Sequence, residues 1–575
     1  MFGLAFAFFL LSPTIASAES SVRHDRVIKF TRPGDERLSV AEVKAIFLQS
    51  AKVADWVGRY PKKSLTSEAI FDSTSRTWKV RFWSGHAGEI AEGTVDDASG
   101  VVTEAFTGPQ VAWGMARGRP GAFGGKEINS LPVWLAFCAV FLIGLGDFRR
   151  PLSLRNLDLL VLLSFSASLW YFNQGRIFTS VPLVYPPLLY LGGRLAYIGL
   201  RGRPVAHRPP VWPIWLLAAA AVFLLGFRIG LNVRASNVID VGYAGVIGAE
   251  RVASGESPYG HFPADTAHGK KLKPCSTVNP DGKARDYIQP DGRCESVNPQ
   301  GDTYGPVAYL SYLPGLALFG WSHLWDSLPA VHFTSIFFDV LSFLGLALVG
   351  LRFGGTRLAA TLAFAWTAYP FTQYVSNSNS NDALVCAYLI WGFWLVSSPW
   401  ARGAAIALSG WTKFTSLVLA PLWAAYPDGL KPARVARYLA AFCLVSLAAF
   451  SVLALEPNLA EAARTFWDRT LAWQLHRESP FSIWDWRQYH AGLPDLHWLQ
   501  MSLTVVVAVC ALALAYFPRR RSPLQLAALS GFLLIAFEFV MTHWFYLYIV
   551  WFFPFAAITL LAGGTTRYPD ERSHA

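Results

Sequence analysis

Long apolar runs alternate with short polar loops over most of the chain. Each run is about long enough to cross the ~30 Å of hydrocarbon in a bilayer. The pattern predicts a polytopic α-helical membrane protein with about thirteen transmembrane crossings. The runs lie near residues 131–147, 156–172, 180–200, 211–230, 328–350, 357–373, 381–398, 434–455, 497–517, 524–541 and 543–563, with two short helices predicted within 401–426.

The N-terminal part of the chain departs from this pattern. Residues 1–18 form an apolar run that ends in Ala-Ser-Ala, the small-residue spacing of a signal-peptidase site. No Lys or Arg precedes the apolar stretch, so cleavage and retention as an anchor both stay open. In either case the following residues are expected to be exported.

Residues 21–118 are polar and mixed. Leu38–Ser50 has the periodicity of an amphipathic helix, and Thr77–Trp83, Glu89–Val95 and Val101–Phe106 alternate as strands. They predict a small α+β module, and its strand, VDDASG turn and strand resemble the PepSY-like domains found outside membranes. The Gly-rich residues 119–130 are expected to form a linker to the membrane region.

Composition and charge agree with the membrane prediction. The chain is 53% hydrophobic and only 15% charged, which is too apolar for a soluble protein. The net charge of +11 comes from basic residues in short loops, as the positive-inside rule expects, and not from a surface for nucleic acid. The residues that decide the orientation in the membrane are Arg149, Arg150 and Arg155 after the first run, and Arg201, Arg203 and Arg208 after the third.

These charges place both loops, and the tail 564–575, in the cytoplasm. The N-terminal module and the two large loops 231–304 and 456–496 then lie on the outer face of a plasma membrane of bacterial type. Residues 306–322 fit this topology only if they lie in the interface or re-enter the membrane, instead of crossing it.

Cys275 and Cys294 share the first outer loop and flank two PDG turns. A disulfide is expected there because an exported loop is in an oxidising compartment. No metal site is expected, since no Cys or His partners lie at ligand spacing.

The predicted topology gathers polar residues from distant segments on the outer face. They include Asp240, which begins the first outer loop, Asn381 and Asp382, Lys413 within apolar sequence, and His543. Each has a structural alternative: Asp240 and Asp382 suit helix N-caps, Lys413 suits a helix end from which it reaches the interface, and His543 suits an interfacial turn.

In this region the chain resembles the GT-C superfamily of polyprenyl-phosphate-sugar-dependent glycosyltransferases, especially its α-mannosyltransferase-like branch. The resemblance covers about residues 211–563, and residues 131–210 would be additional transmembrane helices. Its features are Asp240 with the following AERVASGESPYG, the Tyr304-Gly305-Pro306 start of an apolar stretch, the SNSNSNDA segment and the Lys413 hairpin. Two departures are Val241, where a second acidic residue is common, and Gly305-Pro306, where the family usually has paired prolines.

The resemblance implies inverting transfer of a sugar, mannose or a pentose such as arabinose, from a polyprenyl-phosphate donor. The acceptor would be an envelope glycan, a glycolipid or a protein. Asp240 would be the general base, with Lys413 and His543 at the donor phosphate. Sugar or acceptor contacts are expected from Asn381, Asp382, Tyr304, Arg477 and Trp484. No cofactor is expected, and a transporter or a non-catalytic scaffold with an exported binding module is the alternative.

Overall fold

The computed structural model describes residues 36–118, 121–202, 210–263, 272–275, 286–289, 292–296, 298–324 and 327–562. The signal-like residues 1–18, the tail 564–575 and Arg203 and Arg208 lie outside the described residues, as does most of the interval between Cys275 and Cys294.

The N-terminal module is an antiparallel sheet of four strands in the order β1-β2-β3-β4, with two helices against one face. Phe47 of the first helix packs on Phe82 of β2, with ring centroids 6.1 Å apart. The buried Asp97 carboxylate accepts hydrogen bonds from the backbone of Arg37 and Leu38 and from Trp78 Nε1. The elements are α2 (Val40–Gln49), α3 (Ala51–Val57), η1 (Lys62–Ser64), β1 (Leu65–Asp72), β2 (Thr77–Ser84), η2 (Gly85–Ala87), β3 (Gly88–Asp96) and β4 (Val102–Thr107).

The helix and three strands predicted in this region are therefore present, and β1 is an addition. The expected linker is more ordered than its glycines suggested. It includes α5 (Lys126–Asn129), whose Ile128 is fully buried, and Phe123 packs on Phe172 and Phe545.

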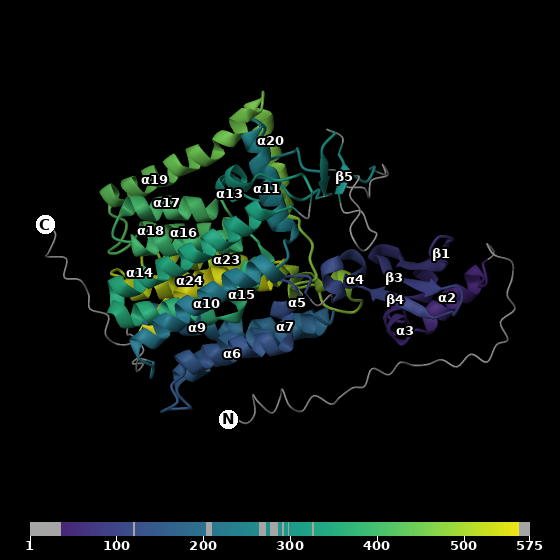
Figure 1. The fold of residues 1–575 in the computed structure, drawn as a ribbon, viewed down its shortest axis with the longest axis horizontal. Coiled ribbons are helices and arrows are strands. Elements are labelled where there is room, and N and C mark those ends of the chain that lie inside the picture. The colour runs from purple at the N-terminus through teal and green to yellow at the C-terminus, as the bar shows by residue number, and fades with distance from the viewer. Residues whose placement is uncertain are drawn as a thin grey trace.

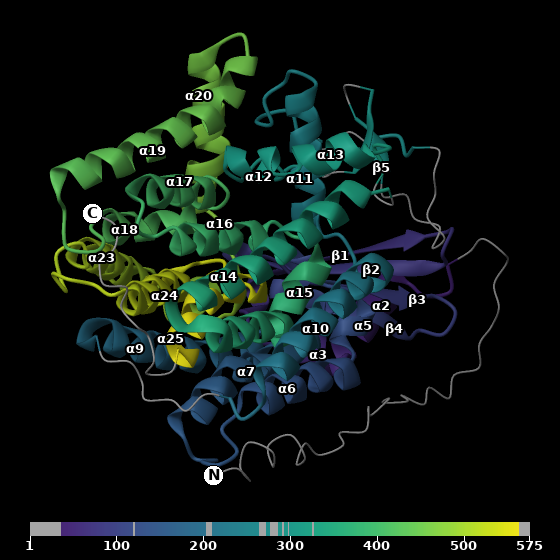
Figure 2. The ribbon, with the colours of Figure 1, turned by 60° about the vertical axis from the view of Figure 1, so that its left-hand side comes forward.

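The rest of the chain is a bundle of helices that lie side by side (Figures 1 and 2). Among the described residues, four helices are long and apolar enough to cross a membrane: Ile214–Ala235, Pro329–Ala368, Pro432–Leu455 and Pro523–Val540; six more apolar helices in this part of the chain are shorter. The predicted count of about thirteen crossings stays a prediction. The principal helices are α6 (Leu131–Leu145), α7 (Leu154–Phe172), α9 (Tyr185–Arg201), α10 (Ile214–Ala235), α14 (Pro329–Ala368), α15 (Pro370–Ser378), α16 (Asp382–Trp394), α17 (Pro399–Gly410), α18 (Ala420–Ala424), α19 (Pro432–Phe450), α23 (His497–Ala513), α24 (Pro523–Val540) and α25 (Ile549–Leu561).

Outward-facing side chains of this bundle are apolar. Trp215 and Phe223 on α10 are 70% and 71% exposed, and Leu447 on α19 is 70% exposed. Large apolar side chains exposed in this number are unfavourable in water and suit contact with lipid.

Helix α14 is two helices joined by a reversal at Gly355, which has φ of 72° and ψ of −169°. A Cβ on Gly350 would lie 2.4 Å from the Cα of Ala359, so the two halves touch beside the reversal. The two separate apolar runs predicted on either side of residue 355 are confirmed. Residues 306–319 form the short helices α12 (Pro306–Leu310) and α13 (Leu313–Phe319), and their place in the interface or as a re-entrant segment stays a prediction.

A buried ion pair joins α10 to the first half of α14. Arg228 Nη2 lies 2.6 Å from Asp339 Oδ1, and Trp366 Nε1 from the second half donates to the same oxygen. Arg228 Nη1 donates to the carbonyl of Trp366 and to Thr372 Oγ1. Asp339 thus links α10 to both halves of α14.

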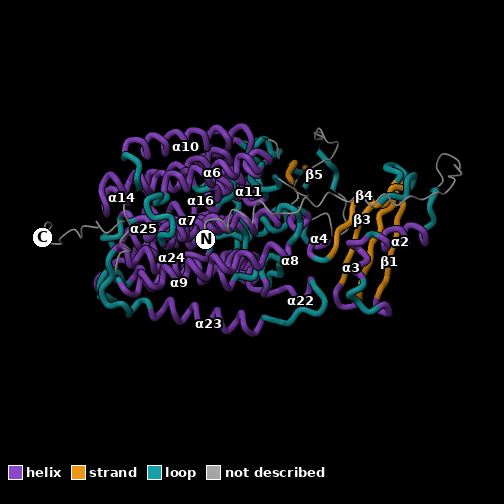
Figure 3. The backbone as a smooth tube through the Cα atoms, turned by 90° about the horizontal axis from the view of Figure 1, so that it is seen from below, coloured by secondary structure: helices purple, strands orange, loops and turns teal. Residues whose placement is uncertain are grey.

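The module and the large loops lie at one end of the bundle (Figures 1 and 3). The loop end carries α11 (Asp240–Ala253), β5 (Asp286–Ile288), β6 (Cys294–Ser296) and α20 (Leu459–Trp467). The module and both predicted outer loops therefore share one end of the molecule. The smaller elements are α4 (Pro109–Ala112), η3 (Gly114–Arg117), α8 (Ile177–Ser180), η4 (Val181–Val184), η6 (Phe414–Leu419), η7 (Ser451–Leu455), the π-helical turn η8 (Asp468–Ala472), α21 (Trp473–Leu475), η9 (Ile483–Asp485), α22 (Trp486–Tyr489) and η10 (Tyr546–Tyr548).

Candidate active site

Lys413 lies in the turn between α17 and η6, where two short helices meet as predicted. Its ammonium group lies 2.6 Å from Asp382 Oδ1, and its side chain is 11% exposed. Three aromatic rings surround this group, with centroids 5.6, 5.2 and 5.4 Å away in Tyr304, Tyr548 and Trp551. An ammonium group among ring faces is stabilised by the ring quadrupoles.

Asp382 is the first residue of α16 and is fully buried. Its Oδ1 also accepts a hydrogen bond from Trp551 Nε1 (3.0 Å), and its Oδ2 accepts one from Ser380 Oγ (2.8 Å). Both oxygens are therefore engaged within the protein. The carboxylate is placed to hold Lys413 and Trp551 more than to contact a ligand.

Arg477 and His543 form the second polar group of the site. Arg477 Nη2 lies 3.2 Å from His543 Nε2, and Ser479 Oγ lies 2.9 Å from His543 Nδ1. Desolvation, followed by the charges of Arg477 and Lys413, holds the pKa of His543 well below its ordinary value. His543 is therefore neutral near pH 7, and Arg477 carries the positive charge of the pair.

Not every N–H group of the Arg477 guanidinium makes a hydrogen bond. Its Nε is buried and has no hydrogen-bond partner among the described residues. A buried N–H group without a hydrogen-bond partner is costly in isolation and favourable beside an anion.

Asp240 begins α11, as the sequence suggested. Backbone hydrogen bonds from Asn237 to Asn377 and from Ile239 to Ser378 fix the chain just before it. The side chain of Asp240 is exposed to water, but the surrounding protein is dense enough that desolvation raises its pKa, against the opposing charges of Arg477 and Lys413. This carboxyl group thus lies within electrostatic reach of both cations.

Two sets of polar contacts hold the large loops at this end of the molecule. Arg469 binds the buried carboxylate of Asp302 through Nε and Nη2, at 2.8 and 2.5 Å. Glu456 accepts hydrogen bonds from the backbone of Ser257 and from His261. The loops 231–304 and 456–496 are thereby tied to each other.

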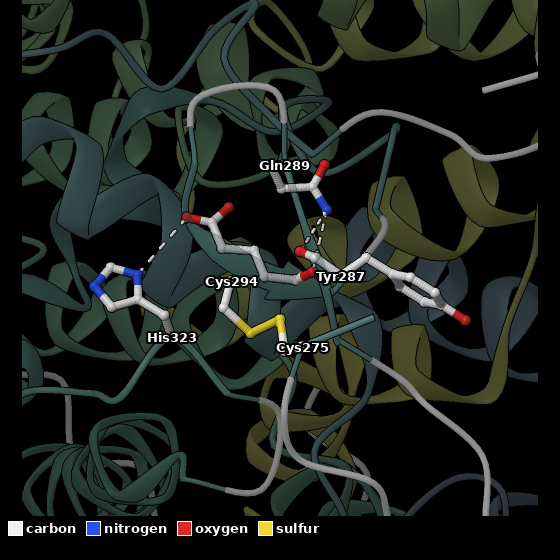
Figure 4. The surroundings of a disulfide bond; sticks show 6 residues. Cys275, Tyr287, Gln289, Cys294 and His323 are labelled. Carbon is white, nitrogen blue, oxygen red and sulfur yellow. Dashed lines mark hydrogen bonds and ion pairs between the residues drawn. A yellow bond between two sulfur atoms is a disulfide. The ribbon is translucent and has the colours of Figure 1, made fainter. Parts of the chain in front are cut away.

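The expected disulfide joins Cys275 to Cys294, with Cα atoms 6.0 Å apart (Figure 4). Next to it, Gln289 Nε2 donates to the carbonyls of Tyr287 and Glu295. The buried carboxylate of Glu295 meets Arg251 of α11 at 3.2 Å. The bridge therefore stabilises the loop that follows Asp240, and within the described residues no cluster of His, Cys, Asp and Glu suits a metal ion.

Two aromatic candidates lie in the packed core instead. Trp484 is buried, and its Nε1 donates to the carbonyl of Phe539. The hydroxyl of Tyr546, three residues after His543, hydrogen-bonds with Ser168 and Ser180. By contrast, Tyr548 and Trp551 contact Lys413 although no sequence motif singled them out.

An apolar pocket of about 500 Å³ lies beside the site. Its walls come from α12, α13, α14, α16, α17 and α19, and its few polar groups include Ser311 and Tyr388, whose hydroxyls lie 2.8 Å apart. Helices α12, α16 and α17 adjoin Tyr304, Asp382 and Lys413 respectively. The pocket and the polar site thus share three elements.

No known family profile and no curated protein matches this chain. Among solved structures, the chain is similar to that of ArnT from Cupriavidus metallidurans bound to undecaprenyl phosphate. The match has 14% identity and a TM-score of 0.38, and it covers 60% of this chain and 59% of that one. A likeness this low transfers neither fold nor activity to the present chain.

Proposed function

We propose that this protein is an integral-membrane glycosyltransferase of GT-C type. It would move a sugar from a polyprenyl-phosphate donor to an envelope glycan, glycolipid or protein on the outer face of the membrane. The observation that carries the proposal is that the charges of Lys413 and Arg477 both act on the Asp240 carboxyl group, with an apolar pocket among the adjoining helices. The carboxylate can accept the proton of the acceptor hydroxyl, the two cations can bind the phosphate, and the apolar pocket can hold the prenyl chain.

The chemistry is a single displacement. The acceptor hydroxyl oxygen attacks the anomeric carbon, Asp240 takes the hydroxyl proton, and the bond from that carbon to the phosphate oxygen breaks. The electron pair leaves with the polyprenyl phosphate, and attack from the opposite side inverts the anomeric configuration. One carboxylate suffices because the phosphate leaves without needing a proton.

The cations stabilise the charge that grows on the departing phosphate. Arg477 is the stronger candidate for direct contact, because its Nε lacks a hydrogen-bond partner among the described residues whereas Lys413 is already paired with Asp382. His543 then orients Arg477 as a neutral neighbour. This assignment moves Arg477 from the sugar or acceptor to the phosphate, and it moves His543 from the phosphate to a supporting position beside Arg477.

The sugar would lie between Asp240 and the aromatic cage of Lys413. Tyr304 supplies a ring face there, and Asn381 has a buried Oδ1 without a hydrogen-bond partner in the described part of the chain. The sugar itself, mannose or a pentose such as arabinose, remains the choice that the sequence resemblance implies.

The test compares purified wild type with Asp240→Asn. Each is given polyprenyl-phosphate-mannose or -arabinose with an envelope extract, and label leaving the lipid pool is followed. Loss of a general base lowers the rate by about 10²- to 10⁴-fold. Asp495→Asn, at an exposed carboxylate in the second large loop, is the matched control and should transfer at the wild-type rate.

Equal transfer by wild type and Asp240→Asn would remove Asp240 from the mechanism. Solute movement across vesicles without any sugar transfer would favour a transporter instead.

A further inference from the structure

The segment Gly108–Gly118, here called the junction segment, connects the N-terminal module to the membrane bundle. Two glycines fix its ends by close approach. A Cβ on Gly108 would lie 2.2 Å from the ring of Trp56 in the module, and one on Gly118 would lie 2.1 Å from the backbone nitrogen of Gly175 in the bundle. Both have positive φ, of 52° and 67°, which glycine adopts without strain.

Polar contacts fix the middle of the junction segment. Gln110 accepts a hydrogen bond from Lys52 of the module and donates one to the carbonyl of Gly175. Arg117 donates to the backbone carbonyl of Gln110 and pairs at 2.6 Å with Glu92 on β3. The segment is thus held by the module on one side and by the bundle on the other.

Trp113, in the middle of this segment, reaches the candidate site. Its ring centroid lies 5.8 Å from that of His543 and 5.9 Å from the guanidinium carbon of Arg477. Phe481 packs edge-on against it, and its Nε1 donates to the hydroxyl of Tyr489. The indole is anchored at one edge while it contacts both members of the Arg477–His543 pair.

We propose that Trp113 is a positioning residue that the N-terminal part of the chain supplies to the catalytic site. It holds the guanidinium of Arg477 so that the free Nε points toward the donor phosphate. The inference rests on the proposed function and extends it: the module is required for transfer because it fixes the junction segment. Trp113 acts through Arg477 and not on the reacting atoms.

The experiment is a double-mutant cycle with farnesyl phosphate as the probe of the phosphate site. Binding of farnesyl phosphate and the KM and kcat for transfer are measured for wild type, Trp113→Ala, Arg477→Ala and the double variant. Misplacement of Arg477 should weaken binding about ten- to a hundredfold in Trp113→Ala. In the Arg477→Ala background the Trp113 substitution should cause no further loss, because its partner is already absent.

Two variants separate positioning from folding. Trp113→Phe keeps an aromatic ring against Arg477 and should recover most of the binding. Trp215→Ala, at a 70% exposed tryptophan on α10, should bind as wild type does.

The outcomes are distinguishable. Wild type that neither binds farnesyl phosphate nor transfers sugar overturns the proposed function, and this inference with it. If wild type binds farnesyl phosphate, two results would overturn only the role of Trp113. One is that Trp113→Ala binds farnesyl phosphate as tightly as wild type does. The other is that the Trp113 substitution weakens binding equally in the wild-type and Arg477→Ala backgrounds.

Discussion

Two buried ion pairs in the helical bundle differ in how completely they are satisfied. Arg228 and Asp339 are sealed from solvent, and further hydrogen bonds from the second half of α14 and the start of α15 complete both groups. Lys413 and Asp382 share a single contact, and the ammonium group is partly exposed among aromatic rings. The sealed pair, Arg228 and Asp339, stabilises the packing of the helices. The open pair, Lys413 and Asp382, has positive charge available for a ligand.

The largest expected effect comes from removing the open pair as a unit. Lys413→Met with Asp382→Asn leaves no unpaired charge, so the protein should fold while transfer falls about 10²- to 10³-fold. Transfer and thermal unfolding are measured on the same preparation. Full activity in the folded double variant would contradict a role for this pair at the phosphate.

Breaking the sealed pair should instead lower the stability of the fold and leave sugar transfer unchanged. Arg228→Met leaves Asp339 buried without its cation, and the free energy of unfolding should fall by about 3–5 kcal/mol. Denaturant unfolding in detergent measures this loss. The molecules that remain folded should transfer sugar with unchanged KM, and a raised KM would show that the pair also acts at the site.

Arg477→Lys tests the geometry of the second cation. Lysine keeps the charge but cannot provide the Nε–H group, which has no partner among the described residues. Loss of one charged hydrogen bond should raise the KM for the donor about tenfold. A donor titration at saturating acceptor checks this, and an unchanged KM would point to Lys413 as the only phosphate contact.

The smallest effect is a shift in pH dependence. Asp240 must be deprotonated to accept a proton, so kcat/KM should rise with pH through a pKa that lies above the ordinary aspartate value. The charge of Arg477 opposes that rise. Arg477→Gln should therefore move the acid limb of the kcat/KM profile to higher pH, while Arg477→Lys should leave it in place. Equal pH profiles for the two variants would show that the charge of Arg477 does not act on Asp240.

The sequence predicted elements whose signal is local. Alternation identified the strands that became β2, β3 and β4, and charge next to apolar sequence identified the Lys413 hairpin. β1 was missed because Leu65–Asp72 is a half-exposed edge strand in which apolar and polar residues do not alternate. The reversal within α14 follows from Gly354 and Gly355 between two apolar runs.

The contacts within the site could not be predicted in the same way. Lys413 and Asp382 are 31 residues apart, and Trp551 is 169 residues from Asp382. Trp113 lies 430 residues before His543 in chain order, near the end of the predicted N-terminal module, where no motif singled it out. Such pairings are fixed by how helices pack, which no single segment encodes.

The separation of Arg228 and Asp339 also has a consequence for biosynthesis. The two residues are 111 positions apart, so α10 is made well before its neutralising partner. At about 5–20 residues per second of synthesis, the ribosome needs roughly 5–20 s to reach Asp339. A charged arginine is unfavourable in lipid for that interval, so we expect α10 to remain beside the insertion machinery until α14 arrives.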